Sequence, residues 1–323
     1  MAITRNDVAR KAGVSPGLVS YVLNGGPRPV SGEARARIEA AIRELGYRRD
    51  GVARQMKTGK SASIGLVLPD IALPYFAEIT KELNARAFDA DHQLLISTSE
   101  FDLSREQSQL ESLAERRVDG IILMSVDPDQ DFSVLTGLGS PVVVIDRPEF
   151  AIGSTRAATE HLIQHGHTKI GFIGGLFRAS KRRIGGWAGA LESAGVGRHD
   201  DWVISMPLTR AGGYLATQQL LQLPNRPTAL LVESDAQACG ALRSIHDLRL
   251  KVPEDVALIT CEGTELAEFT VPSLSSLVQP ISAIARDAVD TVLAEGPPGV
   301  RRVTNTEYRL VPRESCGHIN ALF

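Results

Sequence analysis

Apolar positions in residues 1–47 recur every three to four residues, the period of amphipathic helices. Thr4 and Asp7 have the spacing of a capping box. Gly13 can supply a tight turn, and Pro16 suits the first position of a helix because its missing N–H costs nothing there. The pattern predicts helices over Arg5–Ala12, Pro16–Asn24 and Ser31–Leu45. Two short helices across a glycine-containing turn, completed by a third, are typical of a helix-turn-helix unit.

From Ser61 onward, short apolar runs alternate with amphipathic stretches. The runs predicted to be strands are Ile64–Leu68, Leu94–Ser97, Asp119–Ser125, Val142–Asp146, Lys169–Ile173, Thr228–Val232 and Val256–Thr260. The stretches predicted to be helices include Tyr75–Asp89, Ser104–Arg116, Ser154–His165, Ile184–Ser193 and Ala211–Gln222. This alternation indicates an α/β fold, in which helices cover both faces of parallel sheets.

The expected organisation is an all-α helix-turn-helix domain in residues 1–47, a connecting segment in 48–60 and a two-lobed α/β domain in 61–323. We expect one lobe to comprise residues 61–150 with 279–300, and the other 151–278 with 301–323. Ligands of open α/β sheets bind beyond the carboxyl ends of the strands, so a site is expected in the cleft between the lobes. Residues 51–58 have helical character after a capping Asp50, but so short a helix needs a partner to be stable.

The formal charge of -3 hides an asymmetry along the chain. Residues 1–60 contain 12 Lys and Arg against 5 Asp and Glu, a net charge of +7, whereas residues 61–323 have a net charge of −10. We call residues 1–60 the head and residues 61–323 the body. A basic head and an acidic body indicate that only the head binds a polyanion such as double-stranded DNA. A solvated basic face is the alternative that charge leaves open.

The composition argues against several other classes of protein. Hydrophobic residues make up 43% of the chain and charged residues 23%, which fits neither a disordered chain nor a membrane protein. The most apolar stretch, Ile64–Phe76, is interrupted by Pro69, Asp70 and Pro74, so no transmembrane helix is expected. The start of the chain has no secretory signal, and three scattered cysteines do not suggest a disulfide framework. We therefore expect a cytoplasmic protein.

In a helix-turn-helix unit the second helix enters the major groove of DNA, and groups at helix ends hold phosphates. The residues expected to contact DNA are Thr4, Arg5, Ser15, Pro16, Gly17, Ser20, Tyr21, Asn24 and Arg28. The candidates for phosphate contacts are Arg5, Arg10, Lys11, Arg28 and Arg35. Pro16 and Gly17 lack a side-chain hydrogen-bonding group, so Ser20, Tyr21 and Asn24 would carry more of the base recognition. A small helical packing module without DNA contacts is the alternative.

Several motifs closely resemble the lactose-repressor (LacI/GalR) family of transcription regulators. They are Asp7–Ser15, Val19–Asn24, Ile38–Tyr47, Ala53–Met56, Ile64–Asp70, Arg117–Ile122, Pro141–Arg147, Ala158–Leu162, Gly166–Gly175, Pro227–Ala229 and Val252–Val256. The resemblance covers nearly the whole chain and implies a periplasmic-binding-protein-like core that binds an effector and dimerises. It also implies that residues 51–58 are a hinge helix, ordered when two copies pair on DNA. Ala53 and Met56 would then contact DNA, with Met56 as an apolar wedge in the minor groove.

The resemblance further implies effector-binding residues at the ends of the strands. They are Tyr75, Phe76, Asp146, Arg183, Ser234, Asp235 and Glu262. The two aromatic residues could stack on a ring, Asp146 could accept from ligand hydroxyls, and Arg183 matches an arginine that contacts hydroxyl or carboxylate groups.

The chain departs from the family at three places. Ser234-Asp235 stands where Asn-Asp is usual, and Cys261-Glu262-Gly263 replaces Gly-x-Asp-Asp. Between Arg147 and Ala158 the chain also lacks about one strand's length of residues. Phe150–Gly153 would therefore have to make the first crossing between the lobes.

Catalytic and metal-binding motifs give no support to an enzyme. G-x-S-x-G, H-E-x-x-H and G-x-G-x-x-G do not occur, and His161, His165 and His167 have no second metal-spaced pair. We therefore expect a homodimeric repressor of a roughly palindromic operator, controlled by a sugar or related metabolite, with no cofactor, no metal and no membrane partner. A cytosolic sugar-binding or sugar-processing protein with an incidental basic head is the alternative.

Overall fold

The structure, a computed structural model, describes residues 3–24, 29–47, 55, 59–127, 129–145, 147–305 and 307–317. The chain forms two compact units, Met1–Ser61 and Ala62–Phe323. Of the predicted connecting segment, only residues 55, 59 and 60 are described. Apart from residue 55, the predicted hinge helix and its capping residue Asp50 therefore lie outside the described residues.

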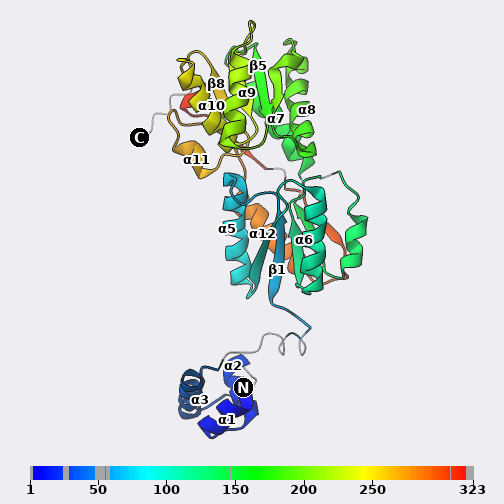
Figure 1. Ribbon diagram of the computed structural model, residues 1–323, viewed down its shortest axis with the longest axis vertical. Coiled ribbons are helices and arrows are strands. Elements are labelled where there is room, and N and C mark those ends of the chain that lie inside the picture. Colours follow the sequence, from blue (N-terminus) through cyan, green and yellow to red (C-terminus); the bar gives the residue numbers. More distant parts are fainter. Residues whose placement is uncertain are drawn as a thin grey trace. The chain divides into compact units, whose positions relative to one another are not determined.

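The first unit contains the three predicted helices (Figure 1). They are α1 (Arg5–Ala12), α2 (Pro16–Asn24) and α3 (Gly32–Leu45). The capping box is confirmed, because the Thr4 side chain accepts from the Asp7 N–H while the Asp7 carboxylate accepts from the Thr4 N–H at 2.9 Å. Gly13 ends α1 with a φ of 65°, in the left-handed region that favours glycine. One fully buried residue from each helix lies in the core: Val8, Val19 and Ile38.

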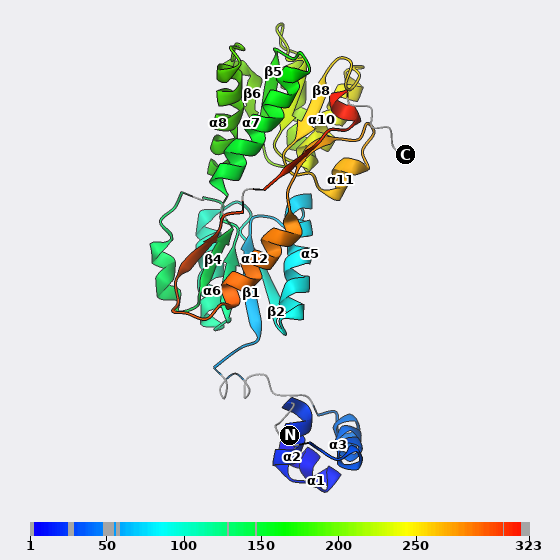
Figure 2. The same cartoon turned by 180° about the vertical axis from the view of Figure 1, so that it is seen from behind.

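The first lobe of the second unit is a five-stranded parallel sheet in the order β10-β4-β3-β1-β2 (Figure 2). Its strands are β1 (Ser63–Leu68), β2 (Gln93–Thr98), β3 (Gly120–Leu123), β4 (Val142–Ile145) and β10 (Val300–Val303). Its helices are α5 (Pro74–Asp89), α6 (Leu103–Glu115), the 3-10 helix η1 (Phe132–Leu138) and α12 (Ile281–Leu293). Side chains alternate along each strand, so Leu66 packs in a core with α5 and α12, whereas Val67 packs in the opposite core with α6.

The second lobe is a six-stranded sheet in the order β11-β9-β8-β7-β5-β6, and of these strands β11 is antiparallel to its neighbour. The strands are β5 (Ile170–Gly174), β6 (Val203–Ser205), β7 (Ala229–Val232), β8 (Ala257–Thr260), β9 (Ser275–Val278) and β11 (Arg309–Val311). The main helices are α7 (Pro148–Gln164), α8 (Arg178–Ser193), α9 (Arg210–Leu221) and α10 (Asp235–Asp247). The short helices are η2 (Asp200–Trp202), α11 (Glu265–Glu268) and η3 (Glu314–Cys316).

Each face of this second sheet has its own core. The α7 and α8 side contains Leu162 and Trp187, and the α9 and α10 side contains Leu220 and Ala241. The predicted arrangement of parallel sheets with helices on both faces is therefore confirmed in both lobes. None of the described helices has the length and hydropathy needed to cross a membrane.

The first crossing between the lobes differs from the sequence prediction. Phe150–Gly153, which were expected to make the crossing, are helical, and α7 begins at Pro148 rather than near Ser154. Proline at the first helical position has a φ that suits the helix, so α7 can begin almost directly after β4. The chain leaves the first sheet at Ile145 and has entered a helix of the second lobe by Pro148.

The last crossing also differs from the prediction. Val300–Val303 pairs in parallel with β4, so residues 301–303 belong to the first sheet and not to the second lobe. The reason is register: Val300 lies opposite Val142 and Val303 lies opposite Ile145, which buries Val303 in the first core. The chain crosses back only between β10 and β11.

Close packing of α7 against α8 gives a test of this fold. A methyl group on Gly186 would overlap Oγ1 of Thr155 and the carbonyl oxygen of Ile152, whereas one on Gly185 would meet nothing within 4 Å. We expect Gly186→Ala to lower the free energy of unfolding by about 1–3 kcal/mol through overpacking. The matched Gly185→Ala should leave it unchanged or raise it by up to about 1 kcal/mol.

Urea denaturation followed by tryptophan fluorescence measures this difference, because both tryptophans, Trp187 and Trp202, are buried in the second lobe. Equal stabilities of the two variants would contradict the close contact between α7 and α8.

Candidate functional site

The amino end of α2 presents a small polar surface. Ser15, Pro16 and Gly17 are exposed, and Oγ of Ser15 accepts from the Leu18 N–H at 3.3 Å. Ser20 and Tyr21 are partly buried beside the fully buried Val19. Three of the predicted DNA-contacting residues therefore lie at the exposed amino end of α2, and two lie further along the same helix. Asn24 is the last residue of α2, and its side chain, Arg28, Ala53 and Met56 lie outside the described residues.

The same unit carries several exposed basic side chains on α1 and α3. Thr4 and Arg5 are exposed at the start of α1. Arg10, Lys11 and Arg35 form ion pairs within the head with Asp7, Glu44 and Glu39, at 3.3, 2.9 and 3.9 Å. Exposed pairs of this kind contribute only about 0–1 kcal/mol, so a DNA phosphate can compete for each of these cations.

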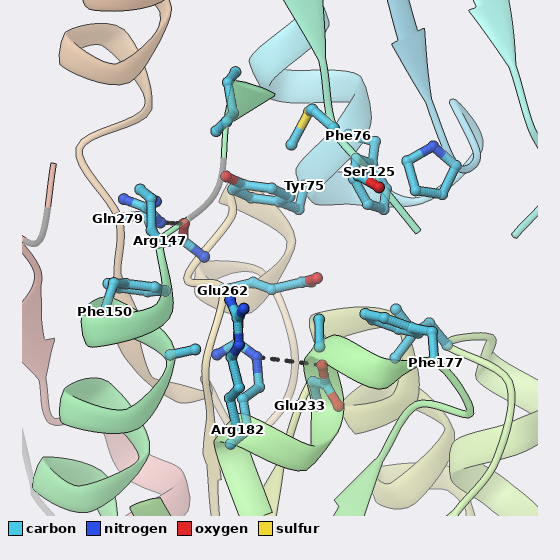
Figure 3. Close-up of a pocket in the computed structure, with 17 residues that line it drawn as sticks. Tyr75, Phe76, Ser125, Arg147, Phe150, Phe177, Arg182, Glu233, Glu262 and Gln279 are labelled. Carbon is cyan, nitrogen blue, oxygen red and sulfur yellow. Dashed lines mark hydrogen bonds and ion pairs between the residues drawn. The ribbon is translucent and has the colours of Figure 1, made fainter. Parts of the chain in front are cut away.

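A pocket lies between the two lobes of the second unit, at the carboxyl ends of the parallel strands. Its cavity volume is about 140 Å³. The aromatic residues that line it are Tyr75, Phe76, Phe150 and Phe177. The charged residues that line it are Arg147, Arg182, Arg183, Glu233 and Glu262. Figure 3 shows Tyr75 and Phe76 on one wall, Arg182 and Glu233 on the opposite wall, and Glu262 between them.

The structure brings together four of the seven predicted effector-binding residues: Tyr75, Phe76, Arg183 and Glu262. Ser234 and Asp235 are not among the lining residues, because both are used inside the fold. Ser234 caps α10 by accepting from the Gln237 N–H at 3.1 Å, and Asp235 accepts from the N–H and hydroxyl of Thr264, both at 2.6 Å. Asp146 lies outside the described residues.

Arg183 is held by a carboxylate that the sequence prediction missed. Its Nε lies 3.2 Å from Oε1 of Glu233, and Oε2 of Glu233 accepts from the Gly175 N–H at 2.7 Å. Burial lowers the pKa of Arg183, but the charge of Glu233, together with smaller effects of Cys261, Glu262 and Tyr75, outweighs this and raises the pKa above its ordinary value. Nη1 of Arg183 is buried and has no hydrogen-bond partner among the described residues.

Arg147 joins the three segments by which the chain passes between the lobes. It lies just before α7, its Nη2 donates to Oε1 of Gln279 between β9 and α12, and its Nη1 donates to the Asn305 carbonyl between β10 and β11 at 3.3 Å. The guanidinium carbon lies 4.0 Å from the centre of the Phe150 ring. Burial, together with the charge of Arg183, lowers the pKa of Arg147.

Glu262 and Tyr75 place two more polar groups in the pocket. Burial raises the pKa of Glu262 well above its ordinary value, and the charge of Asp235 adds to the effect. One oxygen of Glu262 accepts from the Asp235 N–H at 2.9 Å. Burial also raises the pKa of Tyr75. Both shifts favour the protonated, neutral forms of these side chains.

Four contacts tie the lobes together beside the pocket. Arg178 and Arg182 of α8 pair with Asp127 and Asp129 of the first lobe, the former at 3.5 Å. The Glu265 N–H donates to Oε1 of Glu78 at 2.8 Å, and the rings of Phe101 and Phe177 lie 5.4 Å apart. Ion pairs, a backbone N–H to carboxylate hydrogen bond and an aromatic contact therefore connect the lobes without a continuous sheet.

Sequence reasoning missed Arg147, Glu233, Phe150 and Gln279 as pocket residues. Glu233 immediately follows β7 and Gln279 immediately follows β9, so the ends of the strands were the available signal. Phe150 carried no such signal, because its place depends on the early start of α7. No group of three or more histidine, cysteine or acidic side chains in the described part of the chain is arranged to hold a metal ion.

Two family models match the chain. Residues 4–50 match the bacterial regulatory proteins of the lacI family, and residues 159–316 match the periplasmic binding protein-like domain. The ribose operon repressor of Haemophilus influenzae is 33% identical over 303 residues, which cover 90% of this chain and 91% of that repressor. The repressor PurR of Serratia proteamaculans is 32% identical over 305 residues, which cover 90% and 89% of the two chains.

Solved structures agree with these relatives. The lac repressor dimer bound to operator and the anti-inducer ONPF has a TM-score of 0.83 at 26% identity, with 98% of this chain and 99% of that chain covered. The complex of the regulator CelR with cellobiose has a TM-score of 0.66 at 27% identity, with 97% and 99% covered. The likeness extends over both the three-helix head and the two-lobed core, so this chain belongs to the lacI family of bacterial regulatory proteins.

Proposed function

We propose that this protein is a transcriptional repressor that binds a roughly palindromic operator as a homodimer and responds to a sugar or related metabolite bound between its lobes. The proposal rests on two features that occur together in one chain of this family. The amino end of α2 is exposed, and aromatic and charged side chains line a pocket in the second unit. The relatives are named as repressors, and the solved lac repressor is a dimer on its operator. These names favour a regulator over a sugar-processing enzyme.

In the proposed complex, α2 lies in the major groove and the head residues divide into two groups. Ser20, Tyr21 and Asn24 read base edges, while Arg5, Arg10, Lys11, Arg28 and Arg35 hold phosphates. Ser15, Pro16 and Gly17 bring the amino end of α2 close to the backbone, where its free N–H groups favour an anion. Thr4 adds a hydroxyl, and Ala53 and Met56 enter the minor groove from the hinge segment.

Selection of bound duplexes from random DNA, with and without a panel of metabolites, tests the whole proposal. A palindromic consensus whose recovery changes with one metabolite supports it. Recovery of no duplex at low ionic strength would refute it, since the phosphate contacts are strongest under that condition.

The two groups of head residues should respond differently to substitution. We expect Tyr21→Ala to relax base preference at one position in each half-site, at a cost of about 1–3 kcal/mol against the preferred base. Arg5→Ala should instead weaken binding to all duplexes about equally and lower the salt dependence of binding. Competition binding against single-base operator variants at several salt concentrations measures both. An equal loss on every sequence for Tyr21→Ala would contradict its role in base recognition.

The response to effector should depend on Arg183. We expect Arg183→Ala to bring the ratio of operator affinities with and without effector close to one, because the pocket loses its buried guanidinium group. Fluorescence anisotropy with labelled operator measures the ratio. Arg198→Ala removes an arginine of the same lobe whose side chain is 53% exposed and should keep the ratio of the unmodified protein. A preserved response in Arg183→Ala would contradict the pocket assignment.

A further inference from the structure

One of the three guanidinium groups that line the pocket has no carboxylate partner among the described residues. Arg182 pairs with Asp129, and Arg183 pairs with Glu233. Within the described part of the chain, Arg147 donates to two neutral acceptors, Gln279 and the Asn305 carbonyl, and forms no ion pair.

Glu262, the other acid of the wall, is bound elsewhere, because one of its oxygens accepts from the Asp235 N–H. Its raised pKa agrees with a side chain that does not neutralise Arg147. Arg147 is therefore a cation that is only 8% exposed and has no described carboxylate beside it. A buried charge without a counter-ion is costly, so an arriving anion would be stabilised there.

The guanidinium groups of Arg147 and Arg183 lie near one aromatic ring. The guanidinium carbons of Arg147 and Arg183 lie 4.0 and 5.6 Å from the centre of the same Phe150 ring. Nη1 of Arg183 is buried and has no described partner, so it retains donors for a ligand. The donors of a guanidinium group match the acceptor oxygens of a carboxylate or phosphate. Figure 3 shows Arg147 beside Gln279 and close to the ring of Tyr75.

The size and walls of the pocket limit the rest of the ligand. A cavity of about 140 Å³ is close to the roughly 150 Å³ that accommodates a benzene ring. Aromatic walls from Tyr75, Phe76 and Phe177 suit the face of a compact ring. The ligand is therefore small, with one ring or a chain of similar size.

We propose that the effector carries an anionic group, a carboxylate or a phosphate, that is held between Arg147 and Arg183. The effector is then a sugar acid, a sugar phosphate or a related anion of similar size, and not a neutral sugar. This inference rests on the proposed effector site. It adds the chemical class of the effector, which is argued from the charged residues of the site. Because Arg147 also joins the three crossings, the bound anion acts directly on the segments that set the relation of the lobes.

Calorimetric titration of the full-length protein with matched probes tests this inference. Glucose, glucuronate and glucose 6-phosphate share one ring and differ at a single carbon, and ribose with ribose 5-phosphate gives a smaller pair. We expect at least one anion to bind about tenfold or more tightly than its neutral partner, the range expected for hydrogen bonds to a charged group. The carboxylate and phosphate arms show which anion is preferred. Equal or tighter binding of the neutral sugars, or no binding of any anion at millimolar concentration, would overturn the proposal.

Variants at Arg147 separate charge recognition from packing. Arg147→Met should remove the preference for the anion, whereas Arg147→Lys should retain most of it because the charge remains. Arg198→Met removes one exposed arginine of the second lobe and should leave the preference intact. If Arg147→Met keeps the full preference for the anion, the assignment of Arg147 is wrong.

Binding of DNA by the unliganded protein is measured in parallel. Loss of all duplex binding would count against the proposed repressor function. Duplex binding that changes only with neutral sugars would count against the anionic effector alone.

Discussion

The guanidinium group of Arg147 is the contact on which the relation between the two lobes depends. The chain crosses between the lobes three times, and Arg147, Gln279 and Asn305 each belong to a different crossing. One buried side chain therefore connects its own crossing to two others that lie more than a hundred residues further along the sequence. A change in the position of this group moves all three crossings together, because none of them can shift without losing a hydrogen bond in a buried site.

The second constraint is the ion pair of Arg183 with Glu233. Glu233 also accepts from the Gly175 N–H, so this carboxylate joins the end of β5, the end of β7 and the first turns of α8. The position of α8 in turn places Arg178 and Arg182 opposite the acidic side chains of the first lobe. Removing either member of the buried pair would leave an uncompensated charge, which costs several kcal/mol in typical cases. The ion pairs of Arg178 and Arg182 with the first lobe are more exposed than this buried pair. Each is individually weak, so they do not fix the lobes in one arrangement.

Local patterns predicted the head and most of the α/β core, and the remaining errors have physical causes. Capping residues and apolar periods are local signals, and they placed α1, α2, α3 and α5 to within a residue or so. The strand β10 reads Val-Arg-Arg-Val and has no local signature, because its position depends on pairing with the distant β4. In the pocket, the prediction chose Ser234 and Asp235 where Glu233 faces the cavity. Ser234 and Asp235 instead form the start of α10, where their side chains bond inside the fold, and the sequence pattern does not distinguish this role from one in the pocket.

Binding by two linked heads gives a physical reason why a ligand in the pocket can control binding to DNA. The core of the head contains only six buried apolar residues among those described, and its cations are exposed and partly paired within the head. In the proposed dimer, two linked heads that bind together hold the operator more tightly than one head alone. That gain depends on the spacing and order of the connecting segments. In the proposed mechanism, a ligand therefore need not touch the DNA-contacting residues. A small change at the crossings of the core is sufficient, because the gain from simultaneous binding is lost when the geometry no longer allows both heads to engage.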